Sequence, residues 1–162
     1  MHMTIAKILL PHDGTEMSDR AVDKAKEFAK AFDAELLILH VIEHVPIPPS
    51  LILGNERVWI DRTRRSISRI LEEAWMKMVQ EKLINGLTKE NIKATPRVLV
   101  GNRNTINSIS DQILNFAKDN QVDLIIMGSE RLEKRISKMK ALGSVFRGVS
   151  ERASCPVVLI HQ

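Results

Sequence analysis

Five short, mainly apolar runs alternate along this chain with longer segments whose apolar residues recur at helical spacing. The runs cover residues 5–10, 34–42, 95–100, 122–127 and 157–160. Strands that are apolar on both sides are typical of a parallel sheet covered by helices on each face. The alternation therefore predicts an α/β fold, a three-layer sandwich with a five-stranded parallel sheet and helices on both faces.

Four helices are expected between these strands. Ser18 is a candidate N-cap for the first and Thr105 for the third, while Ser144 is expected to begin the last helix. Gly86 is a candidate stop for the second and longest helix. Its expected buried stripe consists of Ile67, Ile70, Leu71, Ala74, Trp75, Met78 and Val79.

The composition indicates one ordinary globular domain, expected over residues 3–162. Hydrophobic residues make up 44% of the 162 residues, and the single cysteine, Cys155, cannot form an intramolecular disulfide. No apolar run approaches the roughly 18 residues that a membrane span needs. We therefore expect a cytoplasmic protein with no membrane association.

A formal net charge of +4 invites a nucleic-acid interpretation, but aromatic residues are only 4% of the chain. Such a composition leaves little material for base-stacking surfaces, so nucleic acid is a disfavoured ligand. The charge is also local: residues 56–69 and residues 130–140 each sum to +3, and the remainder to −2. We expect the first segment, Arg57 to Arg69, to form a solvated helix face, with a polyanion or partner surface as the alternative.

In an open parallel sheet, ligands bind beyond the carboxyl ends of the strands. Those ends are predicted at residues 11–14, 41–43 and 128–131. Gly143 and Ser144 are predicted to lie at a helix start, where free N–H groups favour an anion. The pattern is that of a nucleotide pocket, although the same glycines also suit a simple turn and a helix boundary.

Three segments resemble the universal stress protein family across essentially the whole chain. They are KILLPHDGTEMSDRAVDKAKEFA near the start, ILHVIE after it, and DLIIMGSERLEKRISKMKALGSVFRGVSERASCPVVLI at the end. The resemblance implies a Rossmann-like domain of the adenine nucleotide alpha hydrolase type. It also implies ATP or AMP as ligand, with or without Mg²⁺, and a glycine motif that Gly128 and the Gly143–Ser144 pair match.

The resemblance further assigns roles to individual residues. Pro11 and Asp13 would line the adenosine, the backbone of Val41 would meet the adenine edge, and backbone amides at the last helix would hold phosphate. The implied nucleotide-binding residues are Pro11, Asp13, Val41, Gly128, Ser129, Arg131, Gly143, Ser144, Val145 and Phe146.

The sequence departs from the family motif at Arg131, which stands where a middle glycine is expected, in a loop longer by two residues. Arginine cannot supply the close backbone approach of glycine, but its guanidinium can bind phosphate through two hydrogen bonds. Asp13 has two readings: a ligand for ribose, adenine or a metal ion, or the acceptor of a local turn around His12 to Thr15.

The leading functional prediction is an adenine-nucleotide sensor or switch of the stress response. The alternatives are a nucleotide-independent dimeric interaction protein of the same fold and a slow ATPase in which Asp13 places Mg²⁺. No catalytic set or metal-ligand spacing is recognisable in the sequence. The apolar last strand, Val157–Ile160, is expected at a sheet edge, and the family resemblance implies a homodimer through it.

Overall fold

A computed structural model of the protein describes residues 4–42, 57–101, 108–128 and 140–161. Its strands form one parallel sheet in the order β3-β2-β1-β4-β5, which confirms the predicted five-stranded sheet. The strands are β1 (Lys7–Pro11), β2 (Glu35–Ile42), β3 (Ala94–Val100), β4 (Leu124–Gly128) and β5 (Val157–Ile160). The chain moves outward from β1 to β2 and β3, then crosses to β4 and β5, so the strand order reverses beside β1.

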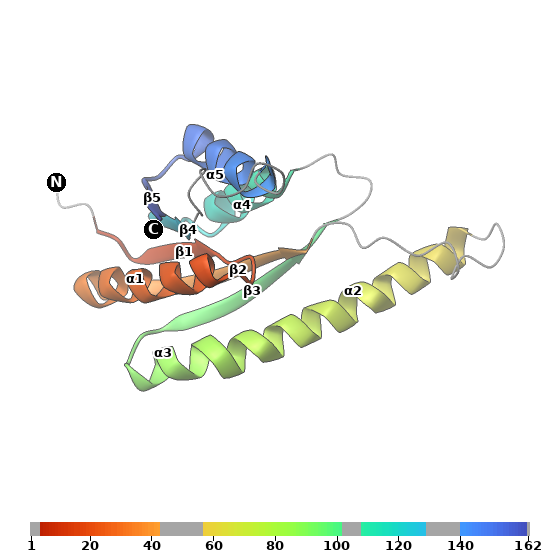
Figure 1. Cartoon of the computed structure of the whole chain (residues 1–162), viewed down its shortest axis with the longest axis horizontal. Coiled ribbons are helices and arrows are strands. Elements are labelled where there is room, and N and C mark those ends of the chain that lie inside the picture. Colours follow the sequence, from red (N-terminus) through yellow and green to blue (C-terminus); the bar gives the residue numbers. More distant parts are fainter. Residues whose placement is uncertain (1–3, 43–56, 102–107, 129–139, 162) are drawn as a thin grey trace.

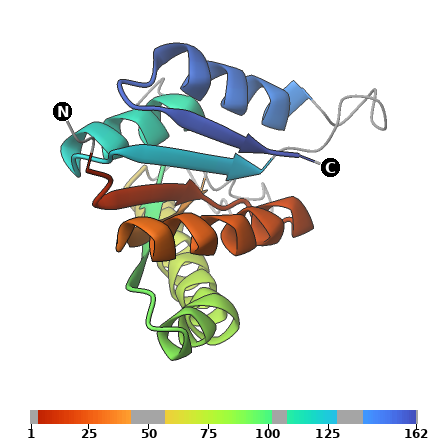
Figure 2. The ribbon, with the colours of Figure 1, turned by 90° about the vertical axis from the view of Figure 1, so that its left-hand side faces the viewer.

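The helices cover both faces of the sheet (Figures 1 and 2). On one face lie α1 (Glu16–Phe32) and a long helical run, in which α2 (Arg57–Val79) continues through the π-helical turn η2 (Gln80–Ile84) into α3 (Asn85–Lys89). On the other face lie α4 (Ile109–Asp119) and α5 (Lys140–Arg152), which pack against each other. The three-layer sandwich is therefore confirmed.

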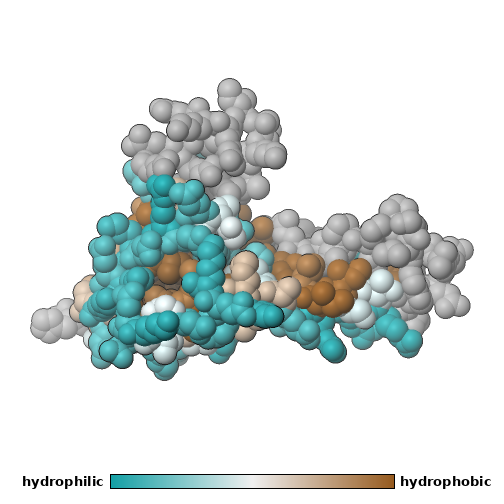
Figure 3. Space-filling view, turned by 60° about the horizontal axis from the view of Figure 1, so that its bottom comes forward, coloured by the Kyte–Doolittle hydropathy of each residue, from teal (hydrophilic) through white to brown (hydrophobic). Residues whose placement is uncertain are grey.

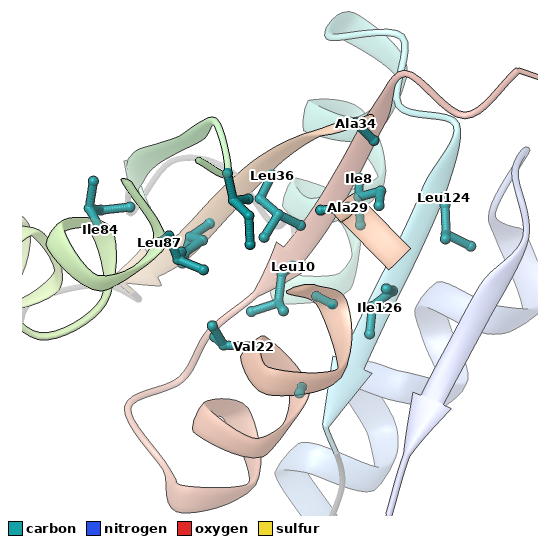
Figure 4. Close-up of a cluster of buried hydrophobic side chains, with 14 of the residues drawn as sticks. Ile8, Leu10, Val22, Ala29, Ala34, Leu36, Ile84, Leu87, Leu124 and Ile126 are labelled. Carbon is teal, nitrogen blue, oxygen red and sulfur yellow. The ribbon is translucent and has the colours of Figure 1, made fainter. Parts of the chain in front are cut away.

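The core is divided in two by the sheet. Ile8 and Leu10 of β1 point toward α1 and the α2–α3 run, in the cluster drawn in Figure 4. Leu9, between them, points to the opposite face, where it meets Ile113 of α4 and Val149 of α5. All three β1 residues have no solvent exposure. This alternation explains why the three central residues of the strand are all apolar.

Both predicted N-caps are wrong by a few residues. Helix α1 is capped by Thr15, whose hydroxyl accepts a hydrogen bond from the Ser18 N–H at 3.3 Å, while Ser18 itself is buried within the first turn. Helix α4 is capped by Ser108 in a capping box with Asp111, and Thr105 lies outside the described residues. In each case a second Ser or Thr nearby provides the cap instead.

The prediction for the long helix is wrong on two counts. Trp75 and Val79 are buried as expected, but Ile70, Leu71 and Met78 are 64%, 43% and 41% exposed. Apolar surface accordingly gathers along this helix in Figure 3. The helical run also passes Gly86 and ends at Lys89. No helix in the described parts of the chain is long and apolar enough to cross a bilayer.

Two leucines of this helical run allow a matched test of which face is buried. Leu87 of α3 is 2% exposed and Leu71 of α2 is 43% exposed. We expect Leu87→Ala to lower the free energy of unfolding by about 2–5 kcal/mol, because it opens a cavity in the core. Leu71→Ala, the same chemical change on the exposed stripe, should cost at most about 1 kcal/mol. Urea unfolding of both variants measures the difference, and equal losses would contradict the described packing.

Candidate functional site

The carboxyl ends of β1, β2 and β4 bring several predicted site residues to one edge of the sheet. Pro11 is the last residue of β1, Asp13 follows it, Val41 lies near the end of β2, and Gly128 ends β4. Since β1 lies between β2 and β4, and the strand order reverses beside it, this edge is the place where such sheets bind ligands.

Asp13 organises the turn that leads from β1 into α1. Its Oδ1 accepts hydrogen bonds from the Thr15 N–H at 3.0 Å, the Thr15 hydroxyl at 2.6 Å and the Ser18 hydroxyl at 2.6 Å. Gly14, with φ of +84°, makes the sharp reversal possible. These contacts support the local-turn reading of Asp13. They engage one carboxylate oxygen, and the residue remains exposed to solvent.

The same contacts set the ionisation of Asp13. Partial burial opposes the charged form, but the hydrogen bonds from Ser18 and Thr15 outweigh it and hold the pKa of the carboxyl below its usual value. Asp13 is therefore ionised at neutral pH, as an acceptor for ribose hydroxyls or a metal ligand would need to be.

Gly128 has a packing role that the sequence did not reveal. A Cβ at this position would clash with the backbone oxygen of Met17 and lie 2.8 Å from its carbonyl carbon. The end of β4 thus touches the first turn of α1, and only glycine fits there. Packing within the fold is therefore enough to require glycine at position 128, whether or not a ligand also approaches.

The last helix begins earlier than predicted. Helix α5 starts at Lys140, so Gly143 and Ser144 lie within it rather than at its start. In a helix with this start, the N–H groups of Ser144, Val145 and Phe146 bond to carbonyls four residues earlier. The side chains of Val145 and Phe146 are half-buried against the α4–α5 core. Ser129 and Arg131 lie outside the described residues.

The sequence did not indicate a polar network that centres on the buried His12. His12 is 4% exposed; its Nδ1 accepts the Gly14 N–H at 3.1 Å, so Nε2 carries the proton and donates to Asp19 at 2.9 Å. The other oxygen of Asp19 accepts a hydrogen bond from Lys82 of η2 at 2.9 Å. The turn after β1 is thereby tied both to α1 and to the long helical run.

A second histidine completes the network. Nδ1 of His40 donates to the backbone oxygen of His12 at 2.7 Å, and its ring stacks on Trp75 with centroids 4.6 Å apart and planes inclined by 8°. The ring of His12 meets Trp75 edge-on at 6.3 Å. Burial lowers the pKa of His40 and outweighs the favourable bond to the His12 carbonyl. The one sequence signal was that both histidines adjoin predicted strand ends.

The geometry defines an open, Rossmann-like α/β domain with a polar edge at its strand reversal. The Universal stress protein family model matches residues 4–161. Universal stress protein YxiE of Bacillus subtilis (strain 168) is 33% identical over 162 residues, covering 96% of this chain and 98% of the relative. The chain therefore belongs to the universal stress protein family.

Solved structures agree on the fold. Universal stress protein UspA from Lactobacillus plantarum superposes with a TM-score of 0.71 at 19% identity, covering 98% of this chain and 99% of that one. A family member from Arabidopsis thaliana, described with AMP bound, gives a TM-score of 0.60 at 18% identity, covering 97% and 92% of the two chains. Within the described residues no group of three or more His, Cys, Asp or Glu side chains could hold a metal ion.

The position of His40 predicts a pH dependence of stability. Because the pKa of His40 is lowered in the fold, the unfolded chain takes up a proton first as the pH falls below about 6.5. The contribution of neutral His40 to the free energy of unfolding is therefore fully present above about pH 6.5 and is lost as the pH falls below it. Asp13 and Asp19 have lowered pKa values, so their ionised forms stabilise the fold at higher pH. That stabilisation is lost only near and below about pH 4.

We therefore expect the free energy of unfolding to fall between pH 7.5 and 5.5, and to fall less steeply in His40→Asn. The asparagine amide can still donate to the His12 carbonyl but does not titrate. Urea unfolding across this range tests the prediction. Parallel curves for the two proteins would show that His40 is not responsible.

Proposed function

We propose that this protein binds an adenine nucleotide, ATP or AMP, at the carboxyl edge formed by β1, β2 and β4, as a sensor or switch rather than as a rapid enzyme. Family membership and the AMP-bound Arabidopsis relative support the ligand class. The observation that carries the proposal is the ionised Asp13 at the strand reversal. One of its oxygens is fully engaged by Thr15 and Ser18, which leaves the other oriented by the turn for a ligand.

In this arrangement Pro11 and Asp13 line the adenosine, and the backbone of Val41 meets the adenine edge. With α5 starting at Lys140, the free N–H groups of its first turn, residues 140–142, are the ones available to phosphate. The amides of Ser144, Val145 and Phe146 would become available only if that turn unwinds. Gly128, Ser129, Arg131 and Gly143 are proposed to border the phosphates.

The test is isothermal titration of protein freed of carried-over nucleotide. We expect ATP or AMP to bind, and Asp13→Asn to bind about tenfold more weakly, because a charge-assisted hydrogen bond becomes a neutral one. Asparagine keeps an oxygen that can accept from Thr15 and Ser18, so the turn should survive. Asp23→Asn is the matched control, since Asp23 lies on α1 with its side chain 77% exposed.

Three other outcomes discriminate the alternatives. No heat with either nucleotide at millimolar concentration would contradict the proposal and favour a nucleotide-independent interaction protein. Equal weakening by Asp23→Asn would remove Asp13 from the site. Metal-dependent release of ADP that Asp13→Asn abolishes would favour the slow ATPase.

We also propose a homodimer formed through β5. This strand lies at the sheet edge, where β4 is its one partner among the described strands, and its four residues are all apolar and half-buried. An unprotected apolar edge favours pairing with a second copy. Size-exclusion chromatography with light scattering at micromolar concentration should give twice the 18.4 kDa chain mass, and a monomer would exclude this interface. We further propose that the protein is located in the cytoplasm.

A further inference from the structure

A polar groove of about 470 Å³ lies between the amino-terminal half of α2 and the carboxyl end of β3. Figure 1 shows α2 running beside β3 and on past its end. The groove lies on the other side of β2 from Asp13, and its Val100 is paired with Ile42, the residue after Val41 of the proposed nucleotide edge. Its lining consists of Asp61, Arg64, Arg65, Ser68, Arg69, Glu72, Val100 and Gly101.

The groove exists because one face of α2 changes character along its length. Near the end of the helix this face carries Trp75 and Val79, which are buried in the core. One to three turns earlier, at the spacing that keeps residues on the same face, it carries Glu72, Ser68 and Arg64. The face is thus polar where the helix runs past the end of β3, and the groove that it lines suits a polar occupant.

Arg64 is the group whose bonding is incomplete. Its side chain is 18% exposed, and its Nε–H is buried without an acceptor among the residues that the structure describes. Its Nη1 reaches Asp61 only at 3.5 Å. Arg65 donates its Nε–H to the backbone oxygen of Asp61 at 3.3 Å rather than to a carboxylate. Arg64 and Arg65 thus share Asp61 as a local partner, and the Nε–H of Arg64 is left for another acceptor.

A larger groove, of about 650 Å³ at the amino end of the sheet, offers a contrast. Three lysines line it: Lys30 pairs with Glu90 at 2.8 Å, Lys93 lies 3.6 Å from Glu35, and Lys7 donates to the backbone oxygen of Asn120 at 3.0 Å. Among the described residues, no buried side-chain donor of that groove is without a partner, whereas Arg64, whose Nε lacks one, lines the groove beside α2.

We propose that the groove between α2 and β3 binds a phosphate-bearing small molecule, held by Arg64 and Arg65 with Arg69 at the rim. The guanidinium fork matches phosphate oxygens two at a time. Arg69 pairs with Glu73 at 3.1 Å, so Arg64 and Arg65 are the main binding groups, and the volume is that of an ordinary small-ligand site. This site assigns a role to part of the cationic segment that the proposed nucleotide function leaves unused.

The experiment uses inorganic pyrophosphate as the probe and the ¹⁵N-labelled full chain, with nuclear magnetic resonance as the readout. We expect the Nε–H signal of Arg64 to shift on titration, together with the backbone amides of residues 64–72 and 100–101. Arg64→Gln should weaken binding about tenfold at this location, because the buried bidentate donor is lost. Arg65→Gln serves as a second variant in case the first fails to fold.

Arg62→Gln is the matched control, because Arg62 lies on the same helix, is exposed, and does not line the groove. It should change the affinity less than twofold. Equal weakening by this variant would overturn the proposal, as would the absence of any shift at millimolar pyrophosphate. Shifts confined to residues 12–14, 128 and 140–142 would also overturn it, while favouring the separate nucleotide site.

Discussion

The fold depends on a central strand that is buried on both faces. Ile8, Leu9 and Leu10 of β1 are fully excluded from solvent, and they alternate between the two halves of the core. The strand also pairs with β2 on one side and β4 on the other. Any displacement of β1 would disturb both cores and both ladders at once. The segment that follows it therefore leaves the sheet from a fixed point and in a fixed direction.

The turn after β1 connects this rigid strand to the candidate site. Asp13 holds Thr15 and Ser18, while His12 joins the turn to Asp19 and, through it, to Lys82. The backbone oxygen of His12 also accepts the hydrogen bond from His40. The residue that faces the proposed ligand is thus a neighbour of a polar network, centred on the buried His12, that contacts α1 and the long helical run. A preorganised carboxylate of this kind loses little conformational entropy when it binds.

The sequence was sufficient to predict the strands, their parallel arrangement and the edge where Pro11, Asp13, Val41 and Gly128 meet. Continuous apolar runs that alternate with helical segments are compatible with few arrangements other than a parallel sheet. It was not sufficient for helix ends. Ser18 and Thr15 are both candidates for one cap, but the Ser18 hydroxyl donates to Asp13 from within the first turn and Thr15 caps the helix.

The long helix shows a different limit of sequence analysis. It carries two apolar stripes, one with Trp75 and Val79 and the other with Ile70, Leu71 and Met78, and both satisfy the helical period. The helical period alone cannot say which stripe meets the sheet. Similarly, Gly128 signals a close approach, but the sequence does not show that its neighbour is the Met17 backbone rather than a phosphate.

The burial pattern divides the long helix into two parts of different stability. Trp75, Val79, Ile84 and Leu87 anchor its second part in the core, whereas no residue from 60 to 74 is buried. A segment with few buried contacts opens locally at a lower free energy than the core does. The amino-terminal part of α2 is therefore held mainly by its continuity with the anchored part. Contacts made there by a ligand or a partner would stabilise that part without requiring any change in the sheet.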